Sequence, residues 1–159
     1  MALFRIERVS PLPVDEAWRR VTDWPSHARH VPLTTVIVTT TPPTHVGTSF
    51  VARTGVGPLA FDDPMEVVRW DPPDAADPAG RCRLEKRGSL LTGWAEIEVR
   101  PHPGPGAASQ VLWVEEIEVR GLPRRLAGLT APTGRFLFGR AVSGLLRGRS
   151  GVRRPGRST

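Results

Sequence analysis

The chain has 159 residues, 39% hydrophobic and 24% charged, a composition typical of one globular domain and unlike disordered or fibrous proteins. Its single cysteine, Cys82, excludes an internal disulfide and a cysteine-rich metal site. The formal net charge of +6 is uneven, because residues 1–118 hold 12 basic and 16 acidic side chains, whereas residues 119–159 hold ten arginines and no acidic residue. The longest apolar runs are too short to cross a bilayer, and charges interrupt the N-terminal segment, so we expect a soluble cytoplasmic protein without a secretory signal.

The first predicted elements are a strand and two short helices. Residues 4–10 begin with alternating apolar and charged side chains, the period of a half-buried strand. Residues 14–21 place their apolar side chains on one helical face and two carboxylates in the first turn, where the helix dipole favours negative charge. Pro25 ends this helix, and residues 25–30 predict a second, shorter one.

Six further strands are predicted after these helices, with no long helix among them. Their ranges are 33–40, 47–54, 59–70, 81–88, 91–100 and 109–119. Clusters of glycine and proline separate them, such as Pro42-Pro43 and the segment from Pro101 to Gly106. Consecutive strands joined by turns of this kind form an antiparallel meander.

A long helix is predicted to close the domain. It begins near Pro132, a residue that suits the first helical position. Apolar residues recur at helical spacing from Phe138 to Leu146, and Phe136 and Leu137 extend that face. The last residues have nothing to bury, so we expect a domain over residues 1–149 and a disordered basic tail over residues 150–159.

This order of elements, together with four short motifs, resembles the SRPBCC superfamily of START-like proteins. The motifs are PVDEAW at residues 13–18, TDW at 22–24, DPMEVVRWDPP at 63–73 and VLWVE at 111–115; none is a catalytic signature. The resemblance implies an α+β helix-grip fold, in which a curved antiparallel sheet of six or seven strands wraps around the long C-terminal helix and leaves a ligand cavity between them. The chain is most similar to bacterial members described as polyketide cyclase/dehydrase-like proteins, a name that reflects ancestry more than activity.

Two predicted strands carry charges on the face that would line this cavity. Strand alternation places Lys86 on the less polar face of residues 81–88, and Glu115 on the apolar face of residues 109–119. A lone charge on an apolar wall is costly, so we expect the two to pair or to lie near Asp63. Such a group could polarise a ligand carbonyl or move a proton; alternatively, the charges lie at strand ends in contact with solvent, and Asp63 fixes a bend.

The remaining wall of the cavity is predicted to be apolar. The candidate ligand-binding residues are Phe50, Met65, Leu84, Ala95, Ile97, Trp113, Phe138, Val142 and Leu145. Gly93 and Ala95 are small residues between larger ones, which would leave room for a ligand. Asp23, His27 and His30 have a spacing that could face a metal, but Pro25 interrupts that helix, so we expect no metal site and no cofactor.

We therefore expect a protein that binds a hydrophobic or aromatic small molecule for carriage, sequestration or sensing. The alternative is a polyketide cyclase or dehydratase-like enzyme, whose catalytic residues would be drawn from Lys86, Glu115 and Asp63. A third possibility is weak contact between the arginine-rich C-terminal end and an anionic membrane, with no specific nucleic-acid partner. Arginine-rich composition from a GC-rich genome is the alternative explanation of that end.

Overall fold

The computed structural model describes residues 1–106, 108–121 and 130–147. The elements in chain order are β1 (Ala2–Ser10), α1 (Val14–Val21), α2 (Trp24–His27), β2 (Thr34–Val38), β3 (Ser49–Thr54), η1 (Gly57–Leu59), β4 (Phe61–Asp71), β5 (Gly80–Arg87), β6 (Leu91–Pro101), β7 (Ser109–Val119) and α4 (Thr130–Arg147). The predicted order of a strand, two short helices, six strands and a long helix is confirmed. The second helix is shorter than the predicted range of residues 25–30: it begins at Trp24 and ends at His27.

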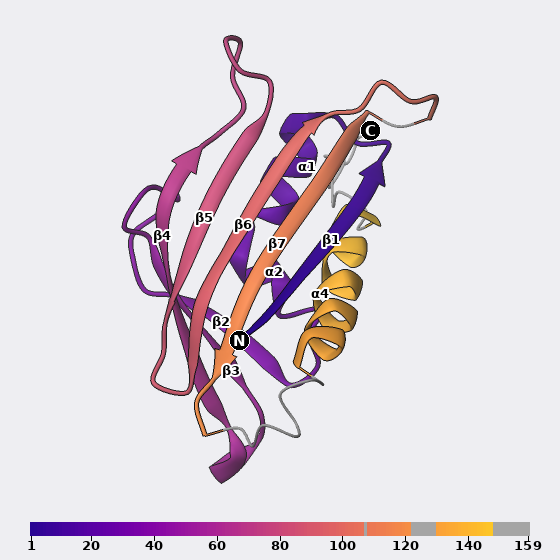
Figure 1. Ribbon diagram of the computed structural model, residues 1–159. Helices are drawn as coiled ribbons and strands as arrows, with labels where there is room; N and C mark the ends of the chain where they lie inside the picture. Colours follow the sequence, from indigo (N-terminus) through magenta and orange to yellow (C-terminus); the bar gives the residue numbers. More distant parts are fainter. Residues whose placement is uncertain (107, 122–129, 148–159) are drawn as a thin grey trace, which may run out of the picture.

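The seven strands form one antiparallel sheet in the order β1-β7-β6-β5-β4-β3-β2. Strands β2 to β7 follow one another as a meander, and β1 pairs with β7 at one edge. Helices α1, α2 and α4 lie on one side of the sheet, with α4 running beside β1 (Figure 1). This arrangement is the predicted helix-grip fold, in which a curved sheet holds the C-terminal helix.

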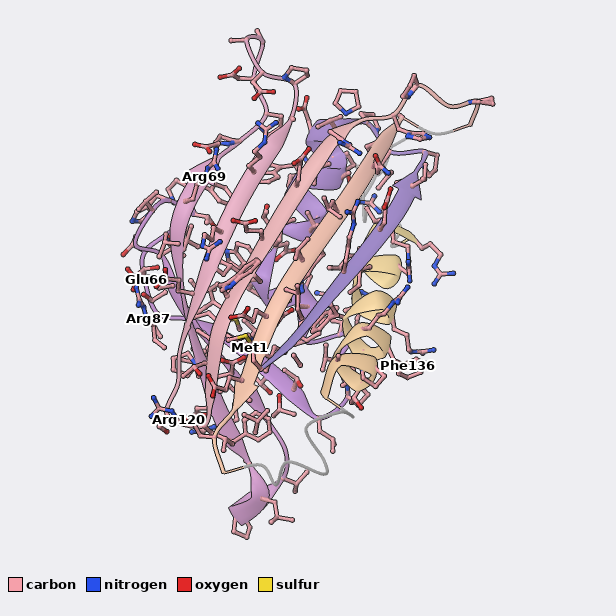
Figure 2. The ribbon with its side chains drawn as sticks, in the orientation of Figure 1. Met1, Glu66, Arg69, Arg87, Arg120 and Phe136 are labelled. Atoms are coloured by element: carbon pink, nitrogen blue, oxygen red, sulfur yellow. The ribbon has the colours of Figure 1, made fainter. Side chains whose placement is uncertain are left out.

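Alternation along the strands gives the sheet an apolar inner face and a charged outer face. On β5, the buried residues Cys82, Leu84 and Lys86 alternate with more exposed charged residues. The outward charges pair between neighbouring strands, as between Arg87 and Glu66 at 3.1 Å, which lie on the outer face in Figure 2. Each such exposed pair adds only about 0.2–1 kcal/mol, so burial of the inner face holds the sheet to the helices.

The two short helices fill one part of the inner face with aromatic rings. The ring of Trp18 on α1 lies 4.9 Å from that of Trp70, and a side chain at Gly80 would collide with it. The ring of Trp24 on α2 stacks on Phe50 at 4.9 Å and 11°. These contacts fix α1 and α2 against β3, β4 and β5, the strands that also bound the cavity described below.

The C-terminal helix differs from the prediction in two respects. It begins at Thr130 instead of near Pro132, and Phe136 is 64% exposed and points away from the sheet (Figure 2). Phe136 lies two residues, or about 200° of helical rotation, before Phe138, so both cannot face the sheet. The predicted tail over residues 150–159 lies outside the described residues. No helix in the described part of the chain is long and apolar enough to span a membrane.

Candidate functional site

A cavity of about 520 Å³ lies between the inner face of the sheet, α2 and the first half of α4. Its wall is mainly apolar and draws on strands β2 to β7. Small-molecule sites in proteins are typically concave and apolar, with volumes of roughly 300–1,000 Å³. The cavity is therefore large enough for a small organic ligand.

Six of the nine residues predicted to bind a ligand lie on the wall of this cavity. They are Phe50, Met65, Leu84, Ala95, Trp113 and Phe138. The placement of Ile97, Val142 and Leu145 was wrong, because these side chains are buried in the packed core and do not line the cavity. The reason is that the cavity reaches α4 only as far as Phe138, whereas the second half of the helix packs against neighbouring elements.

The structure adds wall residues that the sequence did not indicate. They come from α2 and the loop after it, from strand ends and from the start of α4, and include Trp24, His27, Val31, Leu91, Val119 and Thr133. Helix α2 could have been recognised as a contributor, since Trp24 and His27 are three residues apart and so share one side of a helical turn. The strand ends carry no comparable signal.

The three candidate polar residues meet at this wall. The Lys86 Nζ atom donates to Asp63 Oδ2 at 2.6 Å and lies 3.2 Å from Glu115 Oε1. The Trp113 indole N–H donates to the other oxygen, Glu115 Oε2, at 2.9 Å. The side chains of Lys86 and Glu115 are only 2% and 1% exposed, so the alternative of solvent contact at a strand end was wrong. Asp63 pairs with Ala52 in regular register, and the irregularity of β4 lies between Val67 and Arg69, so the alternative that Asp63 fixes a bend was wrong. We call Asp63, Lys86 and Glu115 the polar trio.

Small residues on β6 allow the polar trio to form. Strand β6 lies between β5 and β7, pairing Lys86 with Gly93 on one side and Ala95 with Glu115 on the other. The Lys86 side chain must therefore cross a strand to reach Glu115, over a backbone separation of about 10 Å. Gly93 itself does not line the cavity; its φ is +130°, and a side chain there would collide with the Glu116 carbonyl, so the backbone requires glycine at this position.

The electrostatics of the polar trio are unbalanced, with one ammonium beside two carboxyl groups. Burial opposes the charged form of Lys86, but attraction by Glu115 and Asp63 outweighs it and raises the pKa of Lys86, so the ammonium stays charged. Burial raises the pKa of Glu115, opposed by the Lys86 charge and the Trp113 hydrogen bond. The second oxygen of Asp63, Oδ1, is buried and has no hydrogen-bond partner among the described residues.

His27 adds a neutral polar ring to the wall. Its Nε2 atom lies 2.8 Å from the Val21 carbonyl oxygen, which can only accept, so Nε2 carries the hydrogen. Burial lowers the pKa of His27, which keeps the ring neutral and makes Nδ1 an acceptor. Its ring lies 5.9 Å from that of Trp24 and 5.7 Å from that of Trp113. Among the described residues, no group of three or more His, Cys, Asp and Glu side chains could hold a metal ion.

Comparison with known proteins shows the fold of this chain and nothing finer. No family model matches the sequence, and no curated protein matches it. The crystal structure of Ara h 8.0201 has a TM-score of 0.56 at 13% identity, covering 92% of this chain and 98% of that one. A solution structure from Thermobifida fusca has a TM-score of 0.63 at 18% identity, covering 92% and 91%. The Zhui aromatase/cyclase from a Streptomyces species has a TM-score of 0.57 at 14% identity, covering 91% and 93%.

Proposed function

We propose that the protein binds a hydrophobic or aromatic small molecule in its internal cavity, in order to carry, sequester or sense it. The observation that carries this proposal is an apolar cavity of about 520 Å³ with a small polar group on its wall. Apolar surface provides affinity, and a few placed polar groups orient a ligand. The fold neighbours support the proposal, because one of them is named an aromatase/cyclase, which must admit an organic substrate.

The wall suits a flat ligand with one polar substituent. The aromatic rings of Trp24, Phe50 and Trp113 lie on it, and rings of this kind pack well against aromatic ligands. The polar trio then offers an ammonium as donor and carboxyl oxygens as acceptors at one position of the wall. A ligand hydroxyl or carbonyl that reached this position would be held in a single orientation.

Blocking the cavity tests this proposal. Ala95 is a wall residue that is 2% exposed, so Ala95→Trp would fill the space that a ligand needs. We expect Nile red, a neutral apolar dye, to bind the native protein and to bind Ala95→Trp at least about tenfold more weakly, a loss of roughly 1.4 kcal/mol. The matched control is Glu96→Trp, the next residue on β6, which faces outward and pairs with Arg83.

The result that would refute the proposal is equal dye binding by native protein and a folded Ala95→Trp variant. Circular dichroism establishes whether each variant is folded. If Ala95→Trp fails to fold, Met65→Trp places the same bulk at another point of the wall. If Glu96→Trp weakens dye binding as much as Ala95→Trp does, that result would also count against a site in the cavity.

A second candidate function is a cyclase or dehydratase reaction, and the polar trio is the observation that favours it. Lys86 and Glu115 both line the cavity, as a reaction through them would require. A charged Lys86 could polarise a substrate carbonyl, while Glu115, whose pKa burial raises, could exchange a proton. The test is incubation of the protein with a synthetic poly-β-ketone. A cyclised or dehydrated product that the Glu115→Gln variant no longer forms would support catalysis. If no product forms, binding remains the only proposed function.

Two finer expectations belong to the same proposal. We propose a cytoplasmic location, and weak contact between the arginine-rich C-terminal end and anionic membranes. Six of the ten arginines after residue 118 lie outside the described residues, whereas Arg135, Arg140 and Arg147 lie on α4. Attraction of about 1 kcal/mol per arginine fades within a Debye length, so this contact would be sensitive to salt.

A further inference from the structure

A second hollow lies beside the cavity, between residues 28–35 and the second half of α4. We call it the basic groove; its volume is about 680 Å³. Its charged lining residues are Arg29, Arg140 and Arg147, with His30 between them, and no Asp or Glu among the described residues lines it. The basic groove therefore presents positive charge only.

The cavity and the basic groove are neighbours along one face of α4. Thr133 and Leu137 line the cavity, whereas Arg140, Gly144 and Arg147 line the basic groove. These five positions are separated by three or four residues, so they form one stripe on the helix. The distance along the axis from Leu137 to Arg147 is about 15 Å, at 1.5 Å per residue.

The segment that faces α4, which runs from the loop after α2 into the start of β2, also borders both spaces. Val31 and Thr34 line both the cavity and the basic groove. One molecule with an apolar part and a charged part could therefore touch both without leaving the junction of this segment with α4.

The arginines of the basic groove lack the carboxylate partners that arginines have on the outer face of the sheet, although the Arg140 guanidinium lies over the Phe136 ring, 5.9 Å from its centroid. On the outer face of the sheet, guanidinium groups pair with carboxylates, as Arg53 does with Asp62 through two hydrogen bonds of 2.7 and 2.9 Å. Arg29, Arg140 and Arg147 form no ion pair with a carboxylate among the described residues. The Arg147 Nε atom donates to the Ser143 carbonyl, and its other N–H groups have no acceptor among the described residues. Guanidinium forks match the oxygens of carboxylate and phosphate groups.

Backbone contacts give the basic groove a defined shape. The ring of His30 packs so closely on Gly144 that any side chain at that position would collide with the imidazole. In the facing segment, Leu33 has a φ of +58°, an uncommon conformation for a residue other than glycine, and its carbonyl accepts from the Gly55 N–H at 2.9 Å. Conformations of this kind persist where surrounding contacts impose them and are frequent at ligand sites.

We infer that the ligand of this protein is an amphiphile with a carboxylate or phosphate head group. Its head group binds Arg29, Arg140 and Arg147 in the basic groove, and its apolar body enters the cavity beside Leu137. This inference rests on the proposed binding function and names the chemical class of the ligand. Two independent observations support the inference: the arginines of the basic groove have no carboxylate partner among the described residues, and Val31 and Thr34 line both the basic groove and the cavity.

The test compares compounds that share a chain and differ in the head group. Dodecyl phosphate, dodecanoate and 1-dodecanol are titrated into the full-length protein below their micelle concentrations, with Nile red displacement as the readout. We expect both anions to bind about tenfold more tightly than 1-dodecanol at low salt, because only they reach the arginines. Arg140→Gln or Arg147→Gln should remove much of that advantage and leave 1-dodecanol binding unchanged.

The matched control is Arg135→Gln, which removes an exposed arginine of the same helix outside the basic groove. It should leave the advantage of the anions intact. If Arg135→Gln has the same effect as Arg140→Gln, the advantage reflects general surface charge and the inference is wrong. Equal binding of dodecyl phosphate and 1-dodecanol would overturn it too, while leaving the proposed cavity function in place. If neither 1-dodecanol nor Nile red binds, the proposed function itself fails.

Inorganic phosphate separates a head-group site from an independent anion site. It carries the charge without the chain, so we expect it to bind at least tenfold more weakly than dodecyl phosphate and to leave Nile red in the cavity. Binding of inorganic phosphate as tight as that of dodecyl phosphate would mean that the basic groove takes a free anion. One ligand spanning both spaces would then be excluded.

Discussion

Replacing Lys86 by methionine should destabilise the protein strongly and make its stability depend on pH. The substitution keeps an unbranched apolar side chain, one atom shorter, and removes the charge that lies 2.6 Å from Asp63 and 3.2 Å from Glu115. Two buried carboxyl groups would then face each other without a cation. Removing one partner of a buried ion pair typically costs about 3–5 kcal/mol.

The geometry gives an independent magnitude for this loss. Both carboxylate oxygens lie within 3.2 Å of the same nitrogen, so they are at most about 6 Å apart. Two negative charges at that separation repel by about 3 kcal/mol at an effective dielectric constant of 20. We therefore expect Lys86→Met to lower the free energy of unfolding by about 3–5 kcal/mol at pH 7.

The sign of the pH dependence follows from proton linkage. Burial raises the pKa of Glu115, and Lys86→Met removes the positive charge that opposes this rise, so the folded state of the variant binds more protons than the unfolded chain. The destabilisation is then fully present at pH values above the raised folded pKa, and it declines as the pH falls towards the unfolded pKa near 4. The variant should regain stability relative to the native protein as the pH falls through the raised pKa of Glu115 towards 4.

Urea unfolding followed by tryptophan fluorescence at several pH values measures both effects. The control is Arg87→Met, the adjacent outward residue of β5, whose exposed pairs with Glu66 and Glu85 are worth at most about 1 kcal/mol. The double variant Lys86→Met/Glu115→Gln should recover part of the loss, because it removes one of the two facing charges. A loss in Lys86→Met no larger than in Arg87→Met, or one that does not change with pH, would refute the account of the polar trio.

Three further outcomes follow from single features of the chain. Burial raises the pKa of Cys82 to about 12, so its thiol should not react with an aromatic disulfide reagent at pH 8 until the protein is unfolded. Gly93→Ala should lower the urea midpoint, since any side chain there meets the Glu116 carbonyl. The control is Gly47→Ala, at an open position that also has a positive φ, which measures the cost of the backbone conformation without a collision. Deletion of residues 148–159 should abolish binding to anionic vesicles at low salt and shift the thermal midpoint by no more than about two degrees; binding that survives the deletion would show that the tail is not the tether.

Period-two alternation was sufficient to place the polar residues on the inner face of the sheet. It depends only on which residues share a strand, so Lys86 and Glu115 were assigned to the cavity side correctly. The cost of a lone buried charge also predicted that the two would pair or lie near Asp63, and the distances confirm it. The route of the Lys86 side chain across β6 could not be predicted, because it depends on the register that sets Lys86 opposite Gly93 and Ala95 opposite Glu115. Register is a property of two strands together, and a single strand does not encode it.

The same pattern could not separate the cavity wall from the packed core. Ala95 and Ile97 share one face of β6, and Phe138 and Val142 share one face of α4, yet only the first of each pair lines the cavity. Apolar periodicity reports burial, and both positions are buried or nearly so. Whether a buried side chain meets a neighbour or an empty space depends on the position of α4 along the sheet. The basic groove was missed for a related reason, since Arg29 and Arg140 come together only through tertiary structure.

The polar trio is difficult to explain in a protein that holds a purely apolar ligand. Fully ionised, it carries a net negative charge inside an apolar wall, and well-packed apolar residues in place of a buried ion cluster are often neutral or more stable. The unpartnered Oδ1 of Asp63 adds the cost of a buried acceptor without a donor. A ligand hydroxyl or amine at this wall would supply that donor and lower the cost on binding.

The apolar body that we assign to the ligand should therefore carry a hydrogen-bond donor that reaches Asp63, in addition to an anionic head group in the basic groove. We expect 1-dodecanol analogues with a mid-chain hydroxyl to bind more tightly than those without it. Loss of that difference in Asp63→Asn, with Asp62→Asn as the exposed control on the same strand, would assign the effect to this carboxyl group. Equal binding of the two analogues to the native protein would show that the polar trio does not contact the ligand.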